Sequence, residues 1–215
     1  MTYVTDPGHA SHLIESILAW QPATVAVDIE TADRIRLVQL GFEIANGQAR
    51  QLVFDCDRVP ADMLVPLLRD GTSQKLVHHS QFEQNWLAKQ LGVVMDNVFD
   101  TCIAWQSIQA ELARHYRAGG QVAVDRYVAG WRKHPNRLDT LCAYLIGLSL
   151  PKDEQTSHWE RASLTHDQLV YAAMDVAVLT CVARRTRPLL TLLALDQHVT
   201  QKTRGVAERA LARHT

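Results

Sequence analysis

Short apolar runs bounded by turn residues dominate the first half of this 215-residue chain, whereas helical periodicity dominates the second half. The apolar runs predict strands at residues 24–29, 35–42, 51–54 and 75–78. The first three runs follow one another through short connections, one of which carries the turn signal Asn46-Gly47. They predict an antiparallel meander at one side of a sheet. Because helices then alternate with the later strand, the pattern predicts an α/β domain with a mixed sheet.

Helix end signals support the periodicity. Pro60 opens a helix that Asp70-Gly71 closes, and Thr165 with Gln168 forms a capping-box pattern. The helix that begins there should end before Pro188, because proline breaks a helix interior. The expected helices span residues 9–20, 60–68, 82–91, about 99–116, 138–147, 165–187 and about 189–211. Since neither an internal repeat nor a linker is evident, residues 1–215 are expected to form one domain.

Composition excludes several classes of protein. Apolar residues make up 47% of the chain, which is ordinary for a globular protein. No apolar run reaches the ~18 residues that a membrane span needs, and the N-terminus does not resemble a signal peptide. The four cysteines are scattered and are expected to be reduced core residues. We therefore expect a cytoplasmic protein without a membrane contact.

The charge is unevenly distributed along the chain, although the net charge is only −1. Residues 1–100 hold 7 Lys and Arg against 13 Asp and Glu, whereas residues 101–215 hold 15 against 10. The stretch 114–137 carries six basic residues and a single acid, Asp125. Such a division suits a site that holds cations on one side and an anionic polymer on the other, but it is equally typical of ordinary surface variation.

Three groups of residues are candidates for chemistry. Asp28 and Glu30 end the first strand, two residues apart and therefore on the same face. Adjacent carboxylates repel each other unless a cation lies between them, and Mg²⁺ and Mn²⁺ prefer such oxygens. Tyr171 and Asp175 are four residues apart on one helix face, and Glu83 lies in a first helical turn. Taken alone, each group is more typical of a strand end, a packed aromatic or a helix start.

Taken together, three segments resemble the DEDD superfamily of 3′→5′ exonucleases, in its tyrosine-bearing subclass. The segments are Val27–Thr31, His78–Glu83 and Tyr171–Asp175. Within that superfamily the chain looks most like the catalytic domain of ribonuclease D. The further matching segments are Arg36–Leu40, Leu138–Leu141 and Lys152–Trp159. The resemblance covers about residues 22–190 and implies a ribonuclease H-like fold, in which helices flank a mixed β-sheet.

The resemblance implies hydrolysis of phosphodiester bonds with two divalent cations, Mg²⁺ or Mn²⁺. The implied substrate is single-stranded RNA or DNA with a free 3′ end, and the implied products are 5′-monophosphate nucleotides. The implied metal ligands are Asp28, which would bridge both ions, Glu30, Glu83 and Asp175. These four residues and Tyr171, which would orient the attacking water, are the implied catalytic residues. The residues expected to contact nucleic acid are Thr31, His79 and Phe82.

The sequence departs from the family pattern in four respects, one of which is that the basic stretch 114–137 is longer than the resemblance leads us to expect. Glu83 stands where the family has Asp, so Asp100 is a rival for the second motif's acid. His158 stands where the family more often has Asp. The chain also ends soon after the catalytic region, so the extra helical domains of full-length ribonuclease D are expected to be absent.

Alternatives remain open at this point. Because of Glu83, the chain could be a catalytically impaired exonuclease fold that binds nucleic acid or a protein partner. The choice between RNA and DNA depends on a contact to the ribose 2′-hydroxyl, which sequence does not reveal. A preference for very short oligonucleotides and the oligomeric state are equally undetermined.

Overall fold

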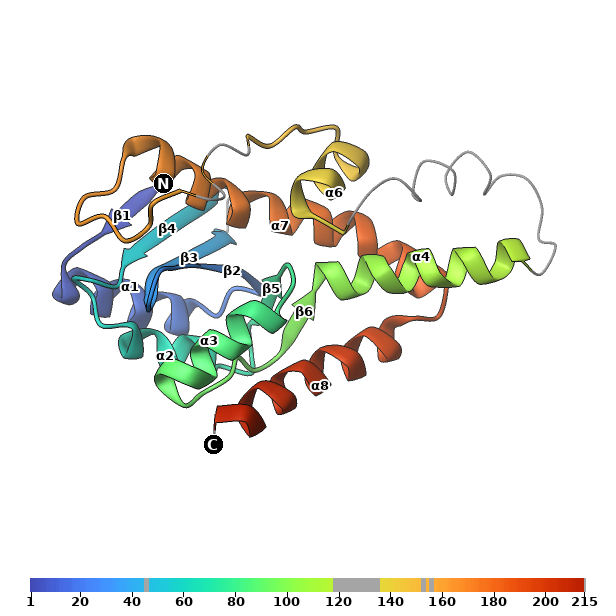
Figure 1. Cartoon of the computed structure of the whole chain (residues 1–215), viewed down its shortest axis with the longest axis horizontal. Helices are drawn as coiled ribbons and strands as arrows, with labels where there is room; N and C mark the ends of the chain where they lie inside the picture. The colour runs from blue at the N-terminus through green and yellow to red at the C-terminus, as the bar shows by residue number, and fades with distance from the viewer. Residues whose placement is uncertain (45–46, 118–135, 152–153, 155–156, 215) are drawn as a thin grey trace.

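Six strands form one mixed sheet in the computed structural model, which describes residues 1–44, 47–117, 136–151, 154 and 157–214 (Figure 1). The strands are β1 (Thr2–Val4), β2 (Thr24–Thr31), β3 (Ile35–Glu43), β4 (Ala49–Asp55), β5 (Gln74–Val77) and β6 (Val98–Asp100). Their order across the sheet is β1-β4-β3-β2-β5-β6. The meander β2-β3-β4 is antiparallel, whereas β1 is parallel to β4 and β5 and β6 continue parallel to β2. The predicted α/β fold with a mixed sheet is confirmed.

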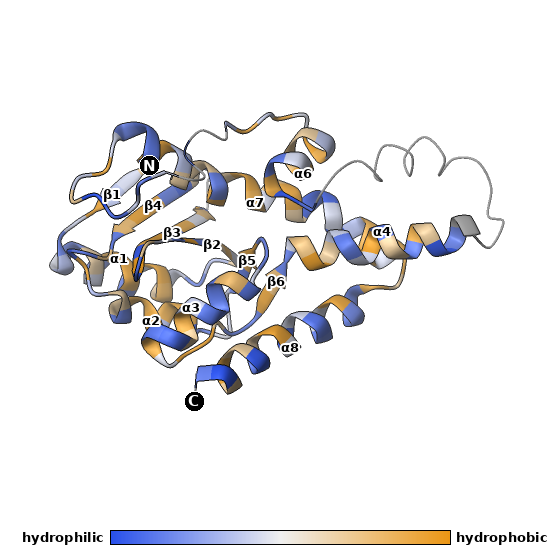
Figure 2. Ribbon diagram, viewed as in Figure 1, coloured by the Kyte–Doolittle hydropathy of each residue, from blue (hydrophilic) through white to orange (hydrophobic). Residues whose placement is uncertain are grey.

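Helices cover both faces of this sheet (Figure 1). The helical segments are α1 (Pro7–Trp20), the 3₁₀ turn η1 (Ala61–Leu64), α2 (Val65–Leu68), α3 (Gln81–Leu91), α4 (Thr101–Arg117), α6 (Leu138–Leu145), α7 (His166–Leu192) and α8 (Asp196–His214). The long helix α7 lies across β2, β3 and β4, and α8 packs along α3 and β6. Apolar residues concentrate on the sheet, whereas outer turns of α3 and α8 are hydrophilic (Figure 2).

The pleat of β2 divides its side chains between the two helical layers. Val25, Val27 and Ile29 are buried in the core that contains α1. Ala26, on the opposite face, packs against Val176 of α7. Since successive side chains of a strand point to opposite faces, Asp28 and Glu30 lie on the α7 face with Ala26.

A glycine lets α7 approach the sheet closely. A Cβ atom added at Gly41 on β3 would lie 2.8 Å from the backbone oxygen of Val176. Real Cβ atoms do not come that near, so any side chain here would push α7 away from the strands. The close contact matters because Asp175 is the residue before Val176 on α7.

Several predicted element boundaries are wrong. The short strands β1 and β6 were not expected, because three residues show too little alternation to be recognised. The expected helix at 60–68 is a 3₁₀ turn followed by one turn of α-helix. The helix expected to end before Pro188 continues to Leu192, and the last helix therefore begins at Asp196 instead of residue 189.

Tertiary packing explains why α7 passes through Pro188. Proline removes one backbone hydrogen bond and costs a helix about 3 kcal/mol. Leu190, two residues further on, is buried with Val182 and with Val199 of α8. Burying a leucine side chain contributes about 1.5–3 kcal/mol, so the contacts beyond the proline offset most of its cost.

The cysteine prediction holds in part. Cys102 and Cys142 are buried, but Cys181 is exposed, so it is not a core residue as expected. None of the helices in the described part of the chain is long and apolar enough to cross a membrane. Asn46 of the predicted turn, residues 118–135 of the basic stretch, and residues 152, 153, 155 and 156 lie outside the described residues.

Candidate active site

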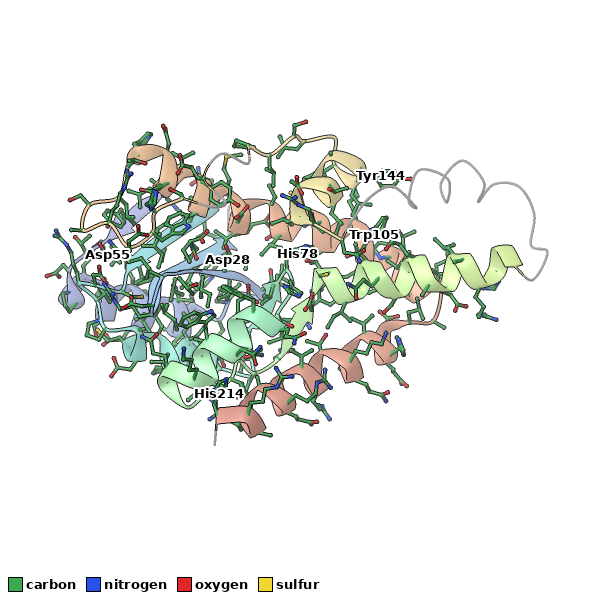
Figure 3. The ribbon with its side chains drawn as sticks, viewed as in Figure 1. Asp28, Asp55, His78, Trp105, Tyr144 and His214 are labelled. Atoms are coloured by element: carbon green, nitrogen blue, oxygen red, sulfur yellow. The ribbon has the colours of Figure 1, made fainter. Side chains whose placement is uncertain are left out.

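Three of the predicted acidic residues meet on the α7 face of the sheet. Asp28 and Glu30 come from the end of β2, and Asp175 comes from α7 above them. One carboxylate oxygen of each lies within 4.8 Å of the others. Asp28 lies near the carboxyl end of β2 and His78 directly follows the neighbouring parallel strand β5, near the middle of the molecule (Figure 3). The carboxyl ends of parallel strands share one edge of the sheet, which is where α/β folds place their sites.

Glu83 joins this cluster from the first turn of α3. Its side chain is buried, and its carboxyl group shares a hydrogen bond with that of Asp28. The other oxygen, Oε2, has no hydrogen-bond partner among the described residues. A buried carboxylate oxygen without a partner is costly, so this atom is available to a ligand.

The electrostatics of the cluster are unfavourable without a cation. Burial raises the pKa of Asp28 to about 7. Burial, followed by the charges of Asp28 and Asp175, raises the pKa of Glu30 to about 10. Burial and then the charge of Asp28 raise the pKa of Asp175 to about 8, and they raise that of Glu83 as well. The charged neighbours behind these shifts are all carboxyl groups.

This donor set fits a hard divalent cation. Carboxylate oxygens are the preferred ligands of Mg²⁺ and Mn²⁺, and four of them converge here. A bound cation would relieve the mutual repulsion and would satisfy the orphaned Oε2 of Glu83. The residues present therefore suit the metal site that the sequence predicts.

Tyr171 lies one helical turn before Asp175 and forms a hydrogen bond with it. Its hydroxyl group donates a hydrogen bond to the Asp175 carboxylate. Its ring packs against buried Trp159, with ring centroids 6.4 Å apart. Burial and then the charge of Asp175 raise the pKa of Tyr171 above its ordinary value, so the phenol stays protonated. The capping box of Thr165 and Gln168 that begins α7 is present as predicted.

Asp100, the rival for the second acidic position, has a different environment. Its two oxygens accept five hydrogen bonds, from the backbone of His79, Ser80, Cys102 and Ile103 and from the Ser80 hydroxyl. It therefore caps α4 and fixes the chain entering α3. Because its lone pairs are already used, Asp100 is a structural acid, and Glu83 is the carboxyl that meets Asp28.

The predicted nucleic-acid contacts are only partly brought together. A cavity of about 430 Å³ is lined by Asp28, Tyr171, Asp175 and His79, among others. Thr31 is half-buried at the end of β2 and does not line this cavity. Phe82 is 41% exposed on α3 and meets Trp86 edge-on, so it is a surface aromatic outside the cavity.

The structure gives a place to two residues of the matching segments that were not predicted as site residues. His78 lines the cavity, and its ring nitrogens contact the Thr101 hydroxyl at 2.9 Å and the Asn136 carbonyl at 3.0 Å. Both nitrogens are thus occupied, so His78 shapes the wall. Gln39 on β3 pairs directly with Asp28 and is fully buried, and its amide atoms have no partner among the described residues. Its signals in the sequence were a polar residue amid an apolar strand and its place in the matching segment Arg36–Leu40.

Comparisons with known proteins agree with this geometry. A family model described as 3′-5′ exonuclease matches residues 1–190. DNA polymerase I from Aquifex aeolicus (strain VF5) is 29% identical over 168 residues, which make up 78% of this chain. The chain spans 24% of the length of that polymerase.

Solved structures share the fold. The catalytic core of RRP6 from Trypanosoma brucei superposes with a TM-score of 0.76 at 23% identity, covering 96% of this chain and 51% of that one. Escherichia coli RNase D superposes with a TM-score of 0.74 at 19% identity, covering 98% and 50%. Brucella melitensis NrnC bound to pGG superposes with a TM-score of 0.68 at 23% identity, covering 97% and 88%.

The predicted membership of the DEDD exonuclease superfamily is confirmed by these matches. The family model extends over 190 of the 215 residues. The chain therefore belongs to the 3′-5′ exonuclease family.

Proposed function

We propose that this protein is a metal-dependent 3′-5′ exonuclease of the tyrosine-bearing subclass, which removes nucleotides from the free 3′ end of single-stranded RNA or DNA. The observation that carries the proposal is the convergence of four carboxyl groups from β2, α3 and α7, two of which, Asp28 and Asp175, line one cavity. Family membership supports the reaction type. The products would be 5′-monophosphate nucleotides.

Asp28, Glu30, Glu83 and Asp175 would hold the divalent cations, Mg²⁺ or Mn²⁺. When bound, two such ions supply activation of the attacking water and stabilisation of charge on the leaving 3′ oxygen. Asp28 is the shared ligand in this proposal, because it contacts Glu83 on one side and the pair Glu30 and Asp175 on the other. Brucella melitensis NrnC has a structure with bound Mg²⁺, which supports the same choice of cation here.

Tyr171 orients the attacking water and does not act as a base. Its pKa is raised by burial and by Asp175, so its hydroxyl remains a hydrogen-bond donor and acceptor at neutral pH. The Asp175 carboxylate holds that hydroxyl, and the Trp159 contact holds the ring. Because the hydrogen bond to Asp175 and the ring contact with Trp159 hold both ends of the side chain, the hydroxyl group has a defined position from which it can orient the attacking water.

The substrate is a single strand because the 3′ end has to enter the cavity unpaired. His79, which lines the cavity, is the residue that we place against the terminal nucleotide. Thr31 and Phe82 lie outside the cavity, so their contacts would be to the neighbouring nucleotide. Escherichia coli RNase D is an exoribonuclease involved in structured RNA processing, Brucella melitensis NrnC has a structure bound to pGG, and the matching relative from Aquifex aeolicus is DNA polymerase I, so the relatives support both polymers as substrates.

A digestion assay tests the proposal. RNA and DNA strands of equal sequence, labelled at the 5′ end, are incubated with Mg²⁺, with Mn²⁺ or with chelator. We expect a ladder that shortens from the 3′ end, disappears with chelator and disappears in Asp28→Asn. Asp62→Asn, which removes an exposed acid, is the matched control and should cleave normally.

The outcomes separate the alternatives. The polymer that shortens faster identifies the substrate class. Cleavage of dinucleotides but not of longer strands would indicate an enzyme for very short oligonucleotides. Retained binding without cleavage under either metal would contradict the proposal and would favour a nucleic-acid-binding module in which Glu83 impairs catalysis.

A further inference from the structure

A second cavity, of about 470 Å³, adjoins the active-site cavity. The two share His79, Cys102 and Gln106 as lining residues. The far wall of the second cavity is α8, which contributes Lys202, Gly205 and Arg209, among others. We call this second cavity the α8 groove. Because α8 begins at Asp196, the groove is built in part from residues beyond the 190 that the family model matches.

The α8 groove has a net positive formal charge, because Lys202 and Arg209 outnumber the acid Asp100 among the described residues that line it. Lys202 and Arg209 are exposed, and neither forms an ion pair within the described residues. The acid that lines the groove is Asp100, whose oxygens are occupied by five hydrogen bonds. An anionic ligand could therefore approach both basic side chains without displacing an internal partner.

Gly205 explains how Arg209 comes to lie over the groove. The two residues are four apart, so they share one face of α8. A Cβ atom at Gly205 would lie 3.0 Å from a guanidinium nitrogen of Arg209, which shows that the guanidinium group lies across the glycine. Glycine destabilises a helix interior relative to alanine, so its use here has a local cost. The guanidinium group of Arg209 occupies the space that a side chain at position 205 would need.

We propose that the α8 groove binds the sugar-phosphate backbone of the strand upstream of the 3′ nucleotide, a step that rests on the proposed exonuclease function. Because His79 and Gln106 line both cavities, the groove lies next to the active-site cavity that would receive the 3′ nucleotide. Phosphates are the ligand that basic side chains recognise without sequence preference. No Phe, Tyr or Trp is among the described residues that line the groove, and the one histidine, His79, is shared with the active-site cavity, so the α8 side of the groove suits the backbone and not stacked bases.

Equilibrium binding to strands of two lengths tests this proposal. The full chain is titrated with 5′-labelled single strands of 2 and 12 nucleotides in chelator, where no hydrolysis occurs. The test variant is Lys202→Gln/Arg209→Gln. The matched control is Arg204→Gln/Arg213→Gln, which removes two exposed charges from α8 outside the groove.

The expected effect depends on strand length. For single strands log K changes with log salt by about 0.7 per phosphate contact, so at 0.1 M salt the loss of two contacts should raise the 12-mer Kd about 25-fold. The salt slope should become shallower by about 1.4. The dinucleotide does not reach the groove, so its Kd should change less than about twofold. An unchanged 12-mer Kd, or an equal loss in the control, would overturn the proposal.

Gly205→Ala keeps the test informative if the double variant is unstable. Alanine favours the helix, so the melting temperature should rise, while the displaced guanidinium should weaken 12-mer binding. The variant should thus be more stable but bind the 12-mer more weakly. If these residues only stabilised the fold, a more stable variant would not lose affinity. A length-dependent loss of binding in chelator, together with no hydrolysis when Mg²⁺ or Mn²⁺ is added, would refute the exonuclease function and leave the groove intact. Hydrolysis with metal but without a length-dependent loss of binding would refute the groove alone.

Discussion

Replacing Asp175 by Asn should stabilise the metal-free protein at neutral and alkaline pH. The substitution keeps an acceptor for the Tyr171 hydroxyl but removes a charge within 4.8 Å of those of Asp28 and Glu30. Two unit charges at that separation repel each other by about 3.5 kcal/mol at an effective dielectric constant of about 20. In the wild type, either the charged carboxylates repel one another or one of the carboxyl groups takes up a proton. In the variant, the neutral amide at position 175 removes both costs.

The pH dependence of unfolding gives a second value for the stability that the Asp175 charge removes. Burial and the charge of Asp28 raise the pKa of Asp175 from 3.8 to about 8 in the folded protein. A carboxyl whose pKa is raised on folding contributes stability at low pH that is lost as the pH rises through the folded value. The loss is about 1.4 kcal/mol per pH unit, or about 4 kcal/mol between pH 5 and pH 8.

Thermal unfolding in chelator measures the effect. We expect Asp175→Asn to gain about 3–4 kcal/mol over wild type between pH 5 and pH 8, which corresponds to roughly 6–16 °C in Tm. Asp167→Asn, an exposed acid in the first turn of the same helix, is the control and should change stability by less than about 0.5 kcal/mol.

Metal titration completes the experiment. A divalent cation at 100 times its Kd should add about 2.7 kcal/mol to wild-type stability, and less to Asp175→Asn, which lacks a ligand. A variant no more stable than wild type at pH 8, or one whose advantage is equal at pH 5, would refute the electrostatic reasoning and with it the account of the site as a cation-dependent cluster.

Three further predictions concern single residues. Tyr171→Phe keeps the ring and should lower kcat by about 100-fold or more in single-turnover assays while the Kd for single strands stays within about twofold; wild-type turnover would remove the hydroxyl from the mechanism. Asp100→Ala should lower Tm because five hydrogen bonds are lost, whereas Glu83→Gln should stay folded and lose metal-dependent cleavage; the reverse result would exchange their roles. Gly41→Ala should destabilise the protein by about 1–3 kcal/mol in denaturant unfolding, whereas Gly71→Ala, with nothing within 4 Å, should not.

The pattern of apolar and polar residues was sufficient to predict the four central strands of the sheet, β4, β3, β2 and β5. It located the strands of the meander and placed Asp28 and Glu30 on the face opposite Ile29, because the side-chain period of a strand is two residues. The capping box was also readable, because both of its hydrogen bonds lie within four residues. The geometry of such local patterns depends only on residues close together in the chain, so the sequence by itself determines them.

Choices between distant residues needed the tertiary structure. Glu83 and Asp100 are both acids near the second motif, and only the tertiary structure shows that Glu83 is the one that meets Asp28. The course of α7 through Pro188 depends on contacts with α8, and these outweigh a local signal that predicted a helix end. The α8 groove arises because helices far apart in sequence lie beside the same cavity. Each of these outcomes depends on which long-range contacts form, and that free energy is not encoded in any short stretch of the chain.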